Sequence, residues 1–180
     1  LGILVESKSA KETIEDINNG KYDSEIKSVK TTMSPEKKKQ MDEHLNKVKS
    51  QQEKETYVDS VVNVMLPQVA KYKLADATDV FFDEGYFSEA QSRRILESSK
   101  KLGLAIKLHA DELADTGGAR LAAELKALSA DHLLKANDQG LEKMGRAGVV
   151  AVLLPTTAFY LGLSYASVKK MRKHGICMAL

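Results

Sequence analysis

The stretch "LAIKLHADELADTGGARLAAELKALSADH", residues 104 to 132, decides the fold. Two apolar runs, LAIKLH and ALSADH, flank a segment in which Leu121, Leu125 and Leu128 recur at helical spacing. We interpret these runs as strands covered on both faces, for which apolar runs are typical. The stretch therefore predicts one strand–helix–strand unit of a parallel sheet.

The same pattern repeats on both sides of this stretch. Further apolar runs predict strands at 78–82, 149–155 and 176–180. Amphipathic segments predict helices at 88–103, 137–148 and 164–175. Successive predicted strands start roughly 22 to 27 residues apart, which is the length of one strand–helix unit. The second half of the chain is therefore predicted to be a series of consecutive βα units.

The first half of the chain is less regular. Residues 1–7, "LGILVES", predict another strand, and residues 56–72 predict a helix with a kink at Pro67. Between them polar residues dominate, and the sequence Ser34-Pro35-Glu36 favours a helix start. A surface helix and a poorly ordered insertion both fit this polar segment.

Bulk composition excludes several functions. The 180 residues contain 27 basic and 25 acidic side chains, a net charge of +2 that favours neither nucleic acid nor an anionic membrane as a partner. No apolar run approaches the length of a membrane span. Cys177 is the only cysteine, which predicts a reducing compartment such as the cytoplasm. Its position in a predicted strand predicts a buried, inert thiol. Leu1 and Leu180 are expected to be cut ends.

Histidines and acids lie where two of the predicted strands end. His109 ends one strand and is followed by Asp111 and Glu112, and His132 ends the next strand after Asp131. Reactive groups in parallel α/β folds lie at the carboxyl ends of strands, so both histidines should face the same mouth. A neutral imidazole binds zinc or iron, and a second histidine or a carboxylate can move protons to and from activated water.

Structural roles for these residues remain open at this point. A histidine at a strand end is often only a hydrogen-bonded structural residue. Asp111 and Glu112 could cap the following helix, whose N-terminus favours acids. Asp131 could fix a turn, and His174 could interact with the carboxyl end of its own helix.

Residues 56–180 closely resemble imidazolonepropionases, enzymes of the amidohydrolase superfamily that act in histidine degradation. The resemblance rests on "HADEL" at 109–113, "SADHL" at 129–133 and "VAVLLPTTAFYLG" at 150–162, in that order. "LVESKS" at 4–9 resembles the second barrel strand of the family. Residues 1–55 are then a diverged N-terminal part and residues 56–180 the barrel units.

The resemblance implies a partial (β/α)8 TIM-type barrel of the metal-dependent amidohydrolase class. It implies hydrolysis of 4-imidazolone-5-propanoate to N-formimidoyl-L-glutamate with one zinc or ferric ion. By position, His109 matches the metal-binding histidine, and Glu112 matches the glutamate that contacts the substrate and takes part in proton transfer. His132 matches the histidine that orients or deprotonates the attacking water.

The chain also departs from the family pattern. The family's His-x-His pair from the first strand and the aspartate from the eighth have no counterpart, and the third strand is not recognisable in residues 18–55. We therefore expect an incomplete cytoplasmic enzyme with little or no activity alone, a small-molecule substrate, no nucleic-acid or membrane partner, and a homodimer as an option for the complete enzyme. A truncated pseudoenzyme that acts as a binding or scaffold protein is the second hypothesis.

Overall fold

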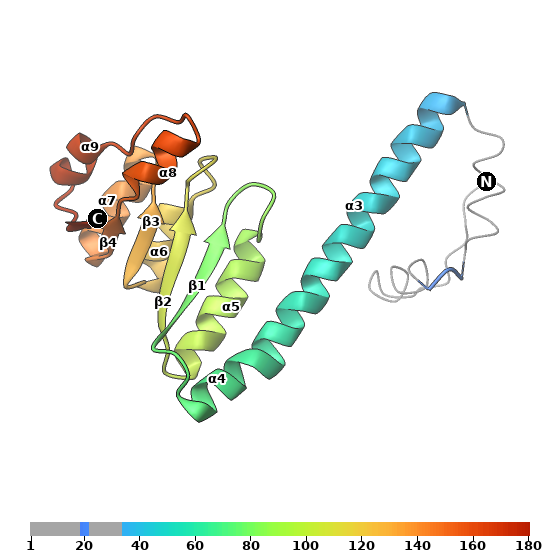
Figure 1. Ribbon diagram of the computed structural model, residues 1–180, viewed down its shortest axis with the longest axis horizontal. Helices are drawn as coiled ribbons and strands as arrows, with labels where there is room; N and C mark the ends of the chain where they lie inside the picture. Colours follow the sequence, from blue (N-terminus) through green and yellow to red (C-terminus); the bar gives the residue numbers. More distant parts are fainter. Residues whose placement is uncertain (1–18, 22–33) are drawn as a thin grey trace. The chain divides into compact units, whose positions relative to one another are not determined.

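The computed structural model describes residues 19–21 and 34–180 (Figure 1). The chain divides into two units, Leu1–Tyr57 and Val58–Leu180. The strand predicted at residues 1–7 lies outside the described residues. Whether residues 1–55 and 56–180 are separate domains stays a prediction.

A long helix, α3, spans Pro35–Ser60. Its start is the predicted one, since proline suits the first helical turn and the backbone N–H of Lys37 donates to Ser34 Oγ at 3.4 Å. Most of its described side chains up to Glu55 are exposed. The surface-helix interpretation therefore describes this segment from Pro35 onward.

The helix predicted at 56–72 is interrupted before Pro67. A π-helical segment, η1, covers Val61–Met65 and leads into α4, Leu66–Tyr72. Proline has no N–H to donate and its ring crowds the preceding turn, so a locally widened helix accommodates it. The helix stops at Lys73, which has a φ of 53°.

Five parallel strands form one sheet in the order β1-β2-β3-β4-β5. The strands are β1 Ala77–Phe82, β2 Ala105–Ala110, β3 Ser129–His132, β4 Val150–Val152 and β5 Met178–Ala179. The helices between and after them are α5 Glu89–Lys101, α6 Gly118–Leu125, α7 Asp138–Ala147, α8 Pro155–Tyr160 and α9 Val168–Lys173. Strand order that follows chain order, with a helix after each of the first four strands, confirms the predicted partial (β/α)8 barrel (Figure 1).

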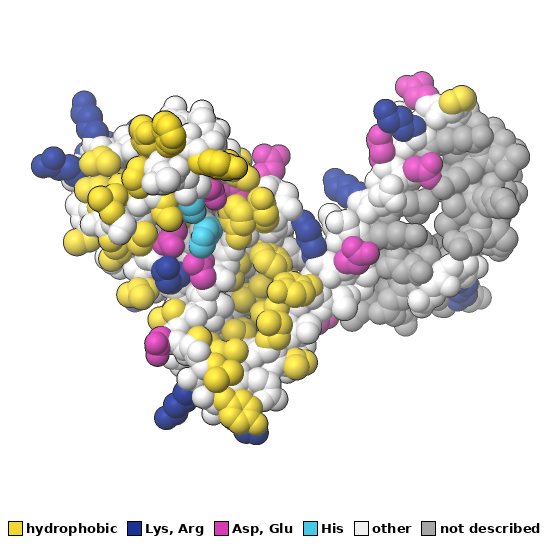
Figure 2. Space-filling view, viewed as in Figure 1, with side chains coloured by type: hydrophobic (Ala, Val, Ile, Leu, Met, Phe, Trp, Pro, Cys, Tyr) yellow, Lys and Arg dark blue, Asp and Glu magenta, His cyan; other side chains and the backbone are white. Residues whose placement is uncertain are grey.

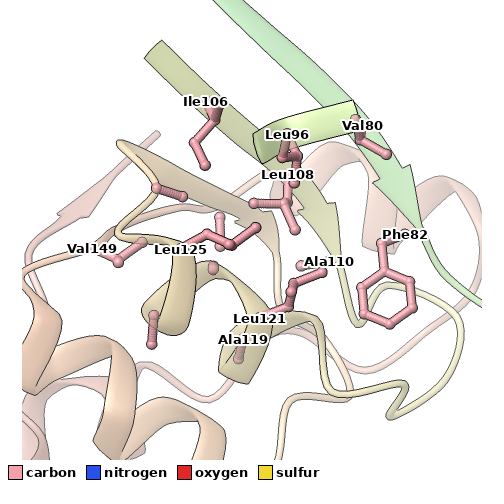
Figure 3. Packing of buried hydrophobic residues seen from close by; sticks show 14 of the residues in the cluster. Val80, Phe82, Leu96, Ile106, Leu108, Ala110, Ala119, Leu121, Leu125 and Val149 are labelled. Carbon is pink, nitrogen blue, oxygen red and sulfur yellow. The ribbon is translucent and has the colours of Figure 1, made fainter. Parts of the chain in front are cut away.

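The hydrophobic core lies between the sheet and the helices α5 and α6 (Figure 3). Alternate residues of β1 and β2 point into it, among them Val80 and Leu108, and meet Leu96 of α5 and Leu121 of α6. Because side chains alternate along a strand, the residues between these apolar positions point to the other face of the sheet. That face carries the polar side chains of the candidate site.

The helix termini follow their sequence signatures. Ser88 caps α5 in a reciprocal capping box with Gln91, and the Asn137 side chain accepts from Gly140 N–H at the start of α7. Gly148 ends α7 with a φ of 72°.

The predicted burial of Cys177 is wrong. Its thiol is exposed, because β5 is a two-residue strand at the edge of the described sheet and Cys177 precedes it. Within the described ranges, the helices are too short or too polar to cross a membrane.

Candidate metal and proton-transfer site

The two histidines come together at the carboxyl end of the sheet. His109 lies near the end of β2 and His132 ends β3, where Ala110 pairs with His132 in the parallel register. Their ring centroids are 5.1 Å apart. The predicted proximity of the two imidazoles is therefore present, while their chemical roles stay predictions.

Charged side chains gather beside His109 on the face of the sheet away from the helices; histidine, acidic and basic side chains lie together there in Figure 2. His109 Nδ1 and Asp79 Oδ1 form a hydrogen bond of 3.0 Å. Lys107 Nζ lies 3.2 Å from Asp131 Oδ2 and 3.8 Å from Asp79 Oδ2. The hydrogen bond to Asp79 raises the pKa of His109, against the opposing effect of partial burial.

Three of these side chains offer a donor set for one cation. The ligand atoms of Asp79, His109 and Asp131 all lie within 4.8 Å of one another. One imidazole nitrogen and two carboxylate oxygens suit zinc or iron, so the chemistry of the residues fits a metal. Lys107 lies beside both carboxylates and offsets one of their two negative charges, which makes the set a weaker cation site than one without an ammonium group.

A second pair, Glu112 and His132, is more deeply buried. Their side chains are 9% and 5% exposed, and Glu112 Oε1 lies 3.5 Å from His132 Nδ1 without forming a hydrogen bond. Among the described residues, this Nδ1 has no hydrogen-bond partner. Burial lowers the pKa of His132, although the Glu112 charge opposes the shift, and the lowered pKa favours the neutral imidazole. A neutral buried imidazole with a free nitrogen can accept a proton.

Backbone strain is concentrated at the same strand ends. Asp111, His132 and Leu133 have φ values of 50°, 72° and 56°, in the left-handed region that residues with side chains rarely adopt. Such conformations persist where the surrounding structure enforces them, and they cluster at functional sites.

Asp111 caps the helix that follows, which is the structural role that its position allows. Its carboxylate accepts from the backbone N–H groups of Thr116, Gly118 and Ala119 at 3.1, 2.8 and 2.8 Å. Its side chain is fully buried, and burial raises its pKa in spite of these bonds. Glu112 makes no such cap and turns toward His132 instead.

Asp131 does not have the role suggested by its position in the sequence, whereas His174 lies at the carboxyl end of its own helix and also has a partner elsewhere. Asp131 lies within β3 and accepts from Lys107 and from Ser129 Oγ, so it fixes no turn. His174 Nε2 lies 3.1 Å from Asp138 Oδ1 at the first turn of α7, so its partner is on another helix.

Asp79 and Lys107 were missed by sequence reasoning. Both lie inside runs that read as strands buried on both faces, where a charged residue is unusual. Their charges were the sequence signal that could have identified them, because a charged residue in a buried parallel strand needs a partner on a neighbouring strand. Lys107 pairs directly with Asp79 in the register of β1 and β2.

An apolar cavity of about 280 Å³ adjoins His132. Leu134, Leu153, Pro155 and Tyr165 line it together with the imidazole, and its lining residues include no lysine or arginine. It can shield one side of His132 from water, but it offers no cation for a carboxylate.

The fold and the site together define the class of protein as a partial (β/α)8 barrel with a polar site at the carboxyl ends of its strands. That site contains an imidazole–carboxylate donor set and a buried His–Glu pair. No family model matches the chain. One crystal structure of an uncharacterized protein aligns at a TM-score of 0.50 and 14% identity, over 67% of this chain and 37% of that one, which agrees with the fold.

Proteins of similar sequence give more specific information than the similarity of fold. Imidazolonepropionase from Bacteroides thetaiotaomicron is 52% identical over 124 residues, 69% of this chain and 30% of that enzyme. The imidazolonepropionase of Shouchella clausii is 53% identical, over 69% of this chain and 28% of its own length. That of Brevibacillus brevis is 50% identical, over 70% of this chain and 30% of its own length.

The resemblance to imidazolonepropionases is thus confirmed, and the chain is related to them over this stretch. It spans about 30% of the length of these relatives.

Proposed function

We infer that the chain carries part of the active site of a metal-dependent hydrolase that opens a cyclic amide, with 4-imidazolone-5-propanoate as the substrate and N-formimidoyl-L-glutamate as the product. The observation that carries this proposal is the buried Glu112–His132 pair beside His109, within a stretch about half identical to imidazolonepropionases. The substrate is a small molecule, as for those relatives.

His109 is the residue proposed to hold the zinc or ferric ion, with Asp79 and Asp131 within reach of the same position. When bound, such an ion supplies Lewis-acid polarisation and an activated water. Asp79 also orients the imidazole through its bond to Nδ1, which leaves Nε2 as the nitrogen available to a ligand.

The proton-transfer roles are assigned to the buried pair. Burial favours the neutral form of His132, and its Nδ1 has no hydrogen-bond partner among the described residues, so it can take the proton of the attacking water. The hydroxyl group adds to the ring carbonyl carbon, the C–N bond breaks, and the proton is delivered to the departing ring nitrogen. Glu112, 3.5 Å from that Nδ1, stabilises the imidazolium while the proton is held and contacts the substrate ring.

The 180-residue chain alone is proposed to have little activity. Its described residues provide one imidazole to the metal position, and the described sheet leaves β1 and β5 as edges instead of closing on itself. We expect less than about a hundredth of the turnover of a complete relative, because metal affinity and substrate positioning both depend on the full ligand set. Loss of imidazolone absorbance in the presence of zinc measures this.

A hybrid enzyme tests the function of the site itself. Residues 57–180 replace the homologous segment of the Bacteroides thetaiotaomicron enzyme, and the hybrid should hydrolyse the imidazolone. In the hybrid, His132→Gln should lower kcat by about a hundredfold or more, within the range that general acid–base catalysis contributes. His174→Gln, in the pair with Asp138 outside the site, is the matched control.

A folded hybrid without turnover contradicts the proposed function. If that hybrid still binds the substrate, the pseudoenzyme hypothesis is favoured. Rapid turnover by the 180-residue chain contradicts only the statement about its activity alone.

A further inference from the structure

The loop that carries Glu112 is held by a carboxylate from another strand end. Asp83 follows β1 and is 3% exposed. Its Oδ2 accepts from the backbone N–H groups of Glu112 at 2.7 Å and Leu113 at 2.9 Å. Its Oδ1 accepts from Ala114 N–H at 3.1 Å and from Glu84 N–H at 2.7 Å.

Three consecutive backbone N–H groups therefore converge on one buried carboxylate. Hydrogen bonds to an ionised acceptor are stronger than neutral ones, and four of them compensate for the burial of this side chain. Because the first of the three belongs to Glu112, the bonds fix the backbone from which the Glu112 side chain extends.

The same loop is tied to the strand end that carries His132. Leu133 N–H donates to Ala110 O at 3.0 Å, and Lys135 N–H donates to Asp111 O at 2.7 Å. The backbone on both sides of Asp111 is thus bonded to the segment that follows His132. A chain of hydrogen bonds runs from Asp83 through the Glu112 loop to the loop after β3.

We propose that Asp83 is a positioning residue that sets the Glu112 carboxylate against the His132 imidazole. This inference rests on the proposed function of that pair. Among the described residues, the hydrogen bonds of Asp83 go to backbone N–H groups and not to the donor set of Asp79, His109 and Asp131. Asp83 acts through the backbone of Glu112.

A different residue, Asp111, connects the loop to the start of α6. Asp111 caps α6 through Gly118 and Ala119, whereas the loop donors bound by Asp83 all lie before the helix and outside the strand ladder. The bonds of Asp83 therefore order the part of the loop that holds Glu112 and are not needed to start the helix.

The test compares Asp83→Asn, Asp83→Glu and Asp138→Asn in the 180-residue chain by NMR. Two readouts are used: hydrogen exchange of the Glu112, Leu113 and Ala114 amides, and the ring nitrogen resonances of His132. Neither requires metal or turnover, so the result is independent of whether the hydrolase proposal holds. The His174 ring, which contacts Asp138, serves as the internal reference for the two Asp83 variants only.

In Asp83→Asn, we expect exchange of the three amides to accelerate at least tenfold and the His132 ring resonances to move while those of His174 stay in place. Asp83→Glu keeps the carboxylate but shifts it by one methylene, so it should change both readouts in the same direction by less. Asp138→Asn makes the same charge change away from the site and should leave both readouts unchanged.

A folded Asp83→Asn protein with altered stability but unchanged His132 resonances overturns the proposal, because Asp83 would then be structural only. If Asp83→Asn does not fold, Asp83→Glu decides alone: coupled shifts of the amides and the His132 ring support the proposal, and an unmoved ring overturns it.

Discussion

Glu112 Oε1 and His132 Nδ1 lie 3.5 Å apart, although Glu112 lies in the loop after β2, His132 ends β3, and the complete helix α6 lies between them in the chain. The parallel register that pairs Ala110 with His132 brings them together. Their separation is therefore set by strand pairing and by the loop backbone, and a change in either should alter the distance between the two side chains.

Removing the His109 imidazole should weaken metal binding. In His109→Ala the donor set keeps only two carboxylates, both already paired with Lys107. Loss of a group that merely supports a ligand costs about 10- to 100-fold in affinity, so loss of the ligand itself should cost at least about tenfold. Equilibrium dialysis with zinc measures it, with His174→Ala as the control; equal affinities in the two variants would contradict the assignment.

Asp111→Asn should destabilise the protein by about 1.5–3 kcal/mol, the range for hydrogen bonds to a charged group. The buried carboxylate accepts from Thr116, Gly118 and Ala119. Asparagine tolerates the left-handed φ of 50° at this position, so the substitution isolates the loss of the carboxylate. Urea denaturation gives the difference. Asp138→Asn, at an exposed first-turn position, should cost less than about 0.5 kcal/mol.

Gly118→Ala should cost about 1–3 kcal/mol through overpacking. An added Cβ would lie 2.7 Å from Ala110 Cβ and 3.2 Å from Asp111 N, so α6 could not keep its place against β2. Thermal or urea unfolding measures the loss. Gly148→Ala is the comparison, since its Cβ would meet open space and only the φ of +72° opposes it. A Gly118→Ala protein as stable as the wild type would show that the helix can move freely.

An ion-pair network between α5 and α6 should make stability fall in acid. Hydrogen bonds from Arg120 and Arg93 lower the pKa values of Glu89 and Glu124 below the ordinary 4.5. A carboxyl group with a lowered folded-state pKa stabilises the fold above its unfolded-state pKa, and that contribution disappears as the pH falls through the lowered value.

Glu89→Gln should therefore be less stable than the wild type by up to about 1 kcal/mol at pH 7, since these side chains are partly exposed. The difference should shrink as the pH falls below 4.5 and vanish once the pH lies below the lowered pKa of Glu89. Urea denaturation across this range measures it, with Glu142→Gln as a control for an exposed pair within one helix. A difference that stays constant with pH would exclude ionisation of Glu89 as its cause.

The sheet could be predicted from sequence because its signals are local. The clearest units are an apolar run followed by an amphipathic helix with a side-chain cap, as at Ser88 after β1 and Asn137 after β3. Strand ends were less predictable: the run at 149–155 forms only Val150–Val152, because Pro155 starts α8. The exposure of Cys177 depends on the position of β5 at the sheet edge, which no local pattern reveals.

The candidate site was predictable only in part, for the same reason. His109, Glu112 and His132 end strands or follow them, so their convergence followed from the parallel arrangement. Asp79 and Asp83 enter the site through register and through a loop conformation. Those contacts join residues about thirty positions apart in the chain, and periodicity along the sequence contains no information about them.

The agreement between strand order and chain order also has a consequence for synthesis. Each strand from β2 to β5 pairs with the one made just before it, so a newly completed unit finds its partner already present. No strand must wait for a distant segment to leave the ribosome, which keeps loop-closure entropy low at every step. The sheet can therefore assemble in the direction of translation, one unit after another.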